Sequence, residues 1–306
     1  MSYFQTLVAI LSTIALFLYG LKSFSDEIKK HSTEKLQKFI EKLTKYSFTG
    51  FLLGAIFTCI IQSSSAVSSI TVALVDSGII KFTDSLAVLL GANVGSTSTA
   101  WLVTFKIDAI APYAILAGSL LSIFPNKLQL IGKSVFYFGI ILFSLELIAQ
   151  SIEPLKTDPA IIDLLKSTDN HLIGVLSGIL VTAIVQSSSV TTGLAILLTQ
   201  QGILSADGAI SIILGSNIGT SSTALIASLQ LNKWAKYSAL ANFAFNTIGV
   251  LICFPFIDHL VQATANLSSE ISYQVAFAHL FFNVFLSVLI LPFLKIIGNY
   301  LYKEIE

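Results

Sequence analysis

The chain has 306 residues, of which 54% are apolar and 11% are charged, and its mean hydropathy is +0.83. This composition excludes a soluble globular protein, because too few polar residues remain to cover its surface, and it indicates an all-α multi-pass membrane protein. The net charge is zero and all 17 basic residues are lysines; this excludes a guanidinium clamp for an anion and gives no reason to expect a nucleic-acid partner.

The first expected element is an apolar run over Phe4–Leu21, which is long enough to cross a bilayer. No basic stretch precedes it and no small-residue cleavage site follows it, so we interpret it as a retained span rather than a signal peptide. Residues 22–46 carry seven lysines against four acids. We expect them to form a solvated surface helix on the cytoplasmic side.

The next apolar run, Phe48–Ile61, is too short to cross. It would form about 21 Å of helix, whereas the hydrocarbon core is about 30 Å thick. A polar tetrad follows it, consisting of Gln62, Ser63, Ser64 and Ser65. Serine hydroxyls cap helix N-termini, so we predict a re-entrant hairpin whose second arm covers Ala66–Val75. Such a turn is tolerated inside a membrane only where it lines a cavity or is buried in protein.

The following helix is predicted to be discontinuous. It begins near Asp84, breaks at Gly91–Gly95, and resumes with Ser96 or Thr97 as the cap of a second half-helix that continues to Phe105. The remaining expected elements are spans at 109–124 and 133–152, an external loop at 153–170, a second hairpin at 171–200, a second discontinuous helix at 206–229, and spans near 235–257 and 273–298.

The polar stretches reveal an internal duplication with an offset of 124 residues. The tetrad returns as Gln186, Ser187, Ser188 and Ser189, and the stretch Gly91–Thr99 returns as Gly215–Thr223. Residues 50–100 match residues 174–224 at 19 of 51 positions without a gap, where chance would give about 3. We predict a first repeat at 1–124, a second at 125–257, and an external loop, a final span and a short cytoplasmic tail at 258–306.

Each predicted repeat crosses the membrane three times, and an odd number of crossings inverts the second repeat relative to the first. The lysines agree with this count, because 14 of the 17 lie in loops that it places on one side, namely 22–46, 76–82, 125–133 and 230–236, and in the C-terminal tail. We therefore expect a protein of the plasma (inner) membrane, with its N-terminus outside and its C-terminus in the cytoplasm.

Two interpretations of the polar stretches compete. Glycine and serine let membrane helices pack closely, and Asn246 and Asn283 could serve only as interhelical hydrogen-bonding groups. Inverted repeats with discontinuous helices are, however, the architecture of secondary transporters, which bind their substrates near the midplane between the repeats. The shared offset of both polar stretches favours a transport site.

The expected chemistry of that site comes from helix ends. Two hairpins and two discontinuous helices would supply four helix N-termini, each equivalent to about half a positive charge, and their sum suits a divalent oxyanion. The amide oxygens of Gln62, Gln186, Asn93 and Asn217 suit an alkali cation. With no carboxylate or histidine at the breaks, we expect no divalent metal site and no cofactor.

The paired tetrads, each followed by a Gly-x-Asn-x-Gly stretch, resemble the type II sodium-phosphate cotransporter family. The segments Ala241–Asn246 and Ala278–Asn283 resemble it too, although Asn242 stands where a histidine is common, while His279 fits. The resemblance implies sodium-coupled transport of inorganic phosphate by alternating access, with the tetrads at the tips of two opposed hairpins. The implied partners are phosphate, sodium and the lipid bilayer, and the chain could form a homodimer.

On this basis we predict two sets of binding residues. The candidates for phosphate are Ser63, Ser64, Ser65, Ser187, Ser188, Ser189, Thr97 and Ser221. The candidates for sodium are Gln62, Asn93, Thr99, Gln186, Asn217 and Thr223.

Other functions remain as alternatives. The same scaffold could form an ion channel or anion pore, with the hydroxyls as its filter, or a sodium-coupled carrier of another oxyanion. An intramembrane hydrolase is disfavoured, because the serines lack a histidine and an acid in the same segment, so we do not expect an enzyme. Glu146, inside an apolar run, is expected to pair with a lysine or to face a cavity.

Overall fold

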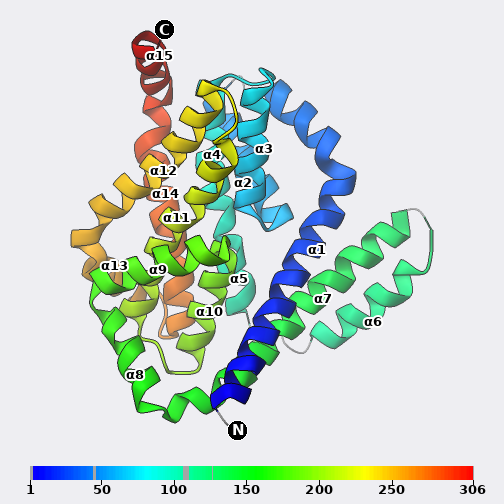
Figure 1. Ribbon diagram of the computed structural model, residues 1–306, viewed down its shortest axis with the longest axis vertical. Coiled ribbons are helices and arrows are strands. Elements are labelled where there is room, and N and C mark those ends of the chain that lie inside the picture. Colours follow the sequence, from blue (N-terminus) through cyan, green and yellow to red (C-terminus); the bar gives the residue numbers. More distant parts are fainter. Residues whose placement is uncertain (1–2, 44–45, 106–109, 126, 306) are drawn as a thin grey trace.

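A computed structural model describes residues 3–43, 46–105, 110–125 and 127–305, and the described residues form helices and turns without a strand (Figure 1). The prediction of an all-α multi-pass membrane protein is confirmed. Among the described residues, six helical stretches are long and apolar enough to cross a membrane: Phe4–Ile28, Phe82–Thr104, Lys127–Thr157, Ala206–Ser228, Lys233–Ala265 and Ile271–Gly298. Large apolar side chains are exposed along these helices, such as Leu251 and Val288, which is the surface that lipid covers.

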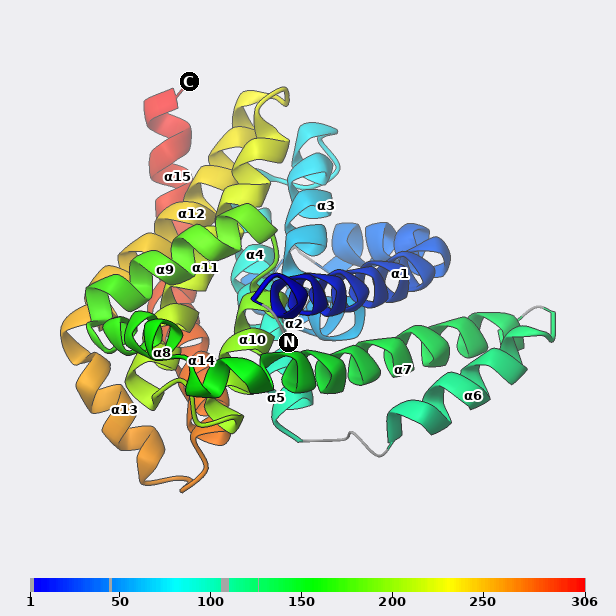
Figure 2. The same cartoon turned by 60° about the horizontal axis from the view of Figure 1, so that its bottom comes forward.

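The first element, α1 (Tyr3–Leu43), is one continuous helix. The charged residues from Lys22 to Leu43 are helical, as predicted, and they continue the first span without a break, because no glycine or proline interrupts the chain between residues 21 and 43. α1 lies antiparallel to α7 (Lys127–Ile152), with Gly20 against Ile141 and Glu27 at 3.9 Å from Lys133 (Figures 1 and 2). The leading helices of the two repeats therefore point in opposite directions, as an inverted repeat requires.

Both predicted hairpins are present. The first consists of α2 (Ser47–Ile61) and α3 (Ser64–Asp76), and the second of α9 (His171–Val185) and α10 (Ser188–Gln200). Their turns are two residues long, and Gln62 and Gln186 occupy them with the same left-handed φ of 57°. The hairpins enter from opposite ends of the molecule, and their tips meet near its mid-height (Figure 1).

The predicted breaks at the glycines are wrong. In the first repeat α4 (Phe82–Ser96) and α5 (Ser98–Thr104) are separated only at Thr97, whose φ of −65° and ψ of −20° are nearly helical. In the second repeat α11 (Ala206–Ser228) is uninterrupted.

The glycines serve close packing instead. A Cβ at Gly91 would lie 1.9 Å from the carbonyl oxygen of Phe51 on α2, and one at Gly215 would lie 2.0 Å from that of Val175 on α9. Only glycine allows backbones to approach this closely. The packing interpretation therefore explains the glycines, and the expected four helix N-termini become two, those of α3 and α10.

The helices that follow α5 in the first repeat and α11 in the second repeat differ in length and packing. α6 (Ala111–Ser122) forms the described part of the span expected at 109–124; its 12 residues are too few to cross the hydrocarbon core, and residues 106–109 lie outside the described chain. It packs against α7 in a hairpin that extends from the body (Figure 2). Its counterpart α12 (Lys233–Cys253) packs in the body against α3, α4 and α11, and α13 (Ile257–Ala265) follows it.

The loops gather at two ends. At one end the Asp76 carboxylate accepts a hydrogen bond from the Asn232 backbone N–H at 2.7 Å, so that the loops 76–82 and 230–236 meet there, near the C-terminus (Figure 1). At the other end, near α8 (Pro159–Lys166), the Nε2 atom of His171 lies within hydrogen-bonding distance, 2.9 Å, of the Asp258 carboxylate. The final helices, α14 (Ile271–Ile290) and α15 (Leu294–Ile305), return to the first end. These two lysine-bearing loops share one end, as the sequence predicted.

Candidate functional site

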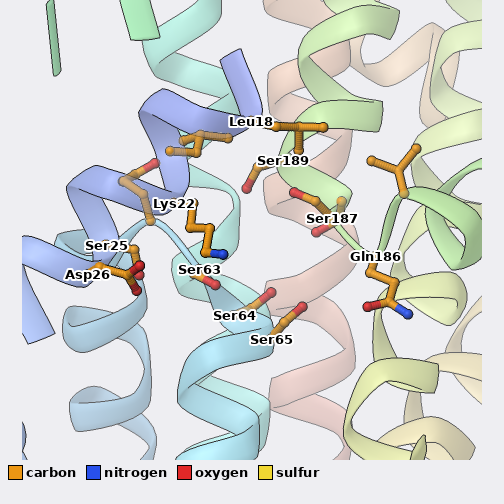
Figure 3. Close-up of a pocket in the computed structure, with 14 residues that line it drawn as sticks. Leu18, Lys22, Ser25, Asp26, Ser63, Ser64, Ser65, Gln186, Ser187 and Ser189 are labelled. Atoms are coloured by element: carbon orange, nitrogen blue, oxygen red, sulfur yellow. The ribbon is translucent and has the colours of Figure 1, made fainter. Parts of the chain in front are cut away.

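A cavity of about 210 Å³ lies between the two hairpin tips and α1 (Figure 3). All eight residues of the two tetrads line it. The packing of the hairpins explains this convergence, because each second arm lies against a helix of the opposite repeat, α3 against α11 and α10 against the short α5. Residues 124 positions apart in the sequence therefore face one space.

The local structure of each tip follows from its residue types. The left-handed glutamine ends the first arm, and the next serine, in an extended conformation, begins the second arm. The Ser63 hydroxyl caps α3 by accepting a hydrogen bond from the Ala66 N–H at 3.2 Å. Ser64 and Ser188, the first helical residues, are 6% and 5% exposed and line the cavity. The positive ends of the α3 and α10 dipoles therefore lie at the cavity wall.

Gln62 links the first tip to α5. Its amide nitrogen donates to the Ser98 hydroxyl at 3.0 Å, and its amide oxygen accepts from the Thr99 hydroxyl at 2.8 Å. The Thr99 hydroxyl also lies 3.3 Å from that of Ser189 in the second tip. Three of the predicted residues thus form one network beside the cavity.

The corresponding residues of the second repeat form no such network. Gln186 is exposed, and its side chain makes no hydrogen bond to the described residues. The hydroxyl of Thr223, the counterpart of Thr99, donates to the Thr220 carbonyl of its own helix at 2.8 Å.

The other predicted residues do not line the cavity. The Asn93 amide donates to Asn242 at 3.2 Å and to Asn246 at 3.3 Å, and so joins α4 to α12. The side chains of the remaining three residues donate hydrogen bonds to backbone carbonyls one turn earlier in the chain: Asn217 to Ile213, Thr97 to Val94 and Ser221 to Ile218.

Three cavity residues on α1 were not predicted as site residues. Lys22, Ser25 and Asp26 line the cavity together with Leu18 and Leu21. The sequence interpretation placed them in a solvated helix, because residues 22–46 are charged as a group. Their spacing of i, i+3 and i+4, directly after an apolar run, was the available signal, since it places them on one helix face.

Three further polar residues lie apart from the cavity. His279 and Asn283 on α14 are each 1% exposed, and neither ring nitrogen of His279 has a hydrogen-bond partner among the described residues. Glu146 lines a second cavity of about 250 Å³ with Gln200 and Gln201, and accepts a hydrogen bond from Gln150 at 3.3 Å. Of the two alternatives predicted for Glu146, a lysine partner or a cavity, the structure shows the cavity.

Two bacterial proteins are similar to nearly the whole of this chain. Uncharacterized protein YqeW of Bacillus subtilis is 32% identical over 289 residues, which are 94% of both chains. Putative inorganic phosphate export protein YjbB of Escherichia coli is 27% identical over 291 residues, covering 94% of this chain and 54% of that protein. This chain therefore spans about half the length of YjbB.

A shorter match connects the chain to mammalian proteins. Sodium-dependent phosphate transport protein 2A of Rattus norvegicus is 38% identical over 92 residues, covering 28% of this chain and 14% of that protein. No solved structure matches the chain. The family model described as Na+/Pi-cotransporter matches residues 16–150 and 155–269. Because this match covers most of the chain, including both tetrads, the chain belongs to the Na+/Pi-cotransporter family.

Proposed function

We propose that the protein carries inorganic phosphate across a membrane, coupled to sodium, and that the phosphate binds between the two Gln-Ser-Ser-Ser tips. The observation that carries this proposal is the convergence of both tetrads on one cavity between hairpins that enter from opposite ends. The family membership and the names of the relatives support phosphate as the substrate.

The size and chemistry of the cavity fit a small oxyanion. A volume of about 210 Å³ is below the 300–1,000 Å³ typical of sites for drug-sized ligands, so it favours an inorganic ion over an organic phosphate. The tetrad hydroxyls can donate hydrogen bonds to phosphate oxygens, and the N-termini of α3 and α10 favour negative charge. We assign phosphate binding to the six tetrad serines.

Sodium is assigned to the oxygens beside the cavity. Gln62 and Thr99 already lie together, and their oxygens are hard ligands of the kind that alkali cations prefer. Gln186 and Thr223 are the equivalent pair in the second repeat. Inverted hairpins around one site allow alternating access, because each hairpin can open the site to its own side of the membrane.

Uptake into liposomes tests the proposal. With purified protein and an inward sodium gradient, labelled phosphate should accumulate above its external concentration, and potassium should not replace sodium. Equal accumulation in both salts would exclude sodium coupling. Equilibration without accumulation would favour a pore, and better uptake of arsenate than of phosphate would favour another oxyanion as the substrate.

We also propose that the end carrying the loops 76–82 and 230–236 faces the cytoplasm of the inner membrane, because cytoplasmic loops are enriched in lysine. In a variant lacking Cys59 and Cys253, a cysteine at Ser77 should react with an impermeant maleimide only from inside. A cysteine at Asp163 should react only from outside. Both side chains are exposed, so reactivity reports sidedness. Labelling of both positions from one side would contradict the topology.

A further inference from the structure

We propose that Lys22, Ser25 and Asp26 of α1 form a third wall of the oxyanion site, and that this wall makes the site select an oxyanion that carries a proton. The proposal rests on the proposed function, since it concerns the same cavity. It adds a specificity element that lies outside the duplicated hairpins.

The geometry places these three side chains at the wall of the cavity, where Ser25 is buried, Asp26 is partly buried and Lys22 is also exposed to solvent. Lys22, Ser25 and Asp26 follow one face of α1 and line the same cavity as both tetrads. Figure 3 shows the Lys22 side chain extending from α1 toward Ser63 of the first tip, with Ser25 and Asp26 one turn further along the helix. A bound anion would therefore contact α1 on one side and the tips on the other.

Ser25 supplies an independent sign of a ligand. Its side chain is 4% exposed, and its hydroxyl has no hydrogen-bond partner among the described residues. Buried polar atoms are nearly always paired, so an unpaired one at a cavity wall points to a group that occupies the cavity. An oxyanion oxygen would accept the missing hydrogen bond.

The charge of Lys22 completes the electrostatics of the site. The N-termini of α3 and α10 together amount to about one positive charge, because each contributes about half. Lys22 is the one cationic side chain among the residues that line the cavity, and it adds another. These groups sum to about two positive charges, and the Asp26 carboxylate on the same wall lowers the net to about one. This balance suits the anions of phosphate near neutral pH, which carry between about one and two negative charges, better than the helix ends and the carboxylate would without Lys22.

Asp26 gives the wall its selectivity. An ionised carboxylate only accepts hydrogen bonds, so it favours a bound group that offers a proton. Phosphate and arsenate both keep at least one acidic proton near neutral pH, whereas sulfate has none. Asp26 would accept the hydrogen bond of the P–OH group and repel sulfate, which is selection by an unfavourable contact with the wrong ligand.

Equilibrium binding to the purified full-length protein provides the test, with labelled phosphate as the probe and sodium present. Lys22→Gln should weaken phosphate binding at least about tenfold, since it removes a charged donor. Lys22→Arg should recover part of the loss. The matched control is Lys133→Gln, because Lys133 lies on α7 beside Glu27 and does not line the cavity; it should bind phosphate as the wild type does.

Competition with sulfate tests Asp26. In Asp26→Asn the affinity ratio of phosphate to sulfate should fall at least about tenfold. In Glu27→Gln, the neighbouring acid that faces Lys133, the ratio should stay unchanged. Ser25→Ala should weaken phosphate binding without lowering the melting temperature of the ligand-free protein, because it removes an unpaired buried hydroxyl. This variant keeps the test valid if a charge variant fails to fold.

The outcomes separate the two proposals. Wild-type phosphate affinity in Lys22→Gln and Ser25→Ala, or an unchanged ratio in folded Asp26→Asn, would overturn the third wall even if the wild type accumulates phosphate with sodium. Phosphate binding that these variants weaken, without any sodium-driven uptake by the wild type, would support the wall and overturn the proposed coupling. A wild type that binds no phosphate would overturn both.

Discussion

The two re-entrant hairpins share the tip sequence Gln-Ser-Ser-Ser, but different contacts hold them in place. The first tip is tied to the neighbouring α5 through Gln62, Ser98 and Thr99. The second tip lacks these contacts, and its hairpin is braced internally by a hydrogen bond of 2.8 Å from the Thr182 hydroxyl to the Thr191 hydroxyl across its two arms.

The first hairpin has no equivalent brace. Thr58 corresponds to Thr182, but the counterpart of Thr191 is Val67, so the buried Thr58 hydroxyl has no hydrogen-bond partner among the described residues. The duplication has therefore preserved the residues that face the cavity and also the Gln, Ser and Thr of the first network, which recur as Gln186, Ser222 and Thr223. What differs between the tips is the hydrogen bonds that these residues make and the position of Thr191, which is Val67 in the first repeat. The same substitution made at matched positions of the two repeats should have equal effects where both repeats make the same contact. Its effects should differ where the contacts differ.

The largest effect is expected at the glycine contacts, which both repeats share. Gly91→Ala and Gly215→Ala should each destabilise the protein by more than the roughly 1–3 kcal/mol typical of overpacking, because the new Cβ would overlap a backbone carbonyl on the hairpin arm. The yield of folded protein in detergent measures this. Gly193→Ala is the control, since its Cβ would meet no atom closer than 3.7 Å. Normal yields for both variants would contradict the packing role.

The second prediction concerns the first-turn serines, which are also shared. Ser64→Ala and Ser188→Ala should each weaken phosphate binding roughly tenfold or more, because a hydrogen bond to a charged ligand contributes about 1.5–3 kcal/mol. Binding and sodium-dependent uptake measure the loss. Ser119→Ala on the outlying α6 should change neither. A large loss in one variant alone would show that the tips are not equivalent at the cavity.

The third prediction concerns the glutamines, whose backbones match while their side-chain contacts differ. Glycine adopts a φ of 57° without a steric clash. Replacing Gln62 or Gln186 by glycine should therefore relieve backbone strain at either position. Gln62→Gly also loses three side-chain hydrogen bonds, with the Cys59 carbonyl and the hydroxyls of Ser98 and Thr99, and should be about 1–2 kcal/mol less stable than Gln186→Gly. Thermal unfolding of the two variants tests the difference, and equal stabilities would remove this distinction between the tips.

The smallest effect is expected at the threonine pair. Thr182→Val should cost about 0.6–1 kcal/mol, the usual contribution of a hydrogen bond within a membrane protein. Thr58→Val should be neutral or stabilising, since it removes an unpaired buried hydroxyl with little change of shape. Melting temperatures measured side by side decide this. A loss of stability in Thr58→Val would indicate a partner for that hydroxyl.

The sequence by itself determined the membrane class, the duplication and the positions of both hairpins. These features depend on local properties: an apolar run of about 14 residues cannot cross the bilayer, and a serine after it begins a new helix. The ends of the hairpin arms were accordingly predicted closely, as α2 ending at Ile61 and α3 ending at Asp76 show.

Only the tertiary structure decided the roles of the glycines and of α1. A Gly-x-Asn-x-Gly stretch permits either a helix break or a close helix contact, and the carbonyl facing Gly91 on α2 selects the contact. Lys22 and Asp26 are ordinary charged residues in the sequence, and they line the cavity because α1 passes the hairpin tips. Which face of a helix meets a cavity depends on neighbours that are remote along the chain, and local sequence carries no record of them.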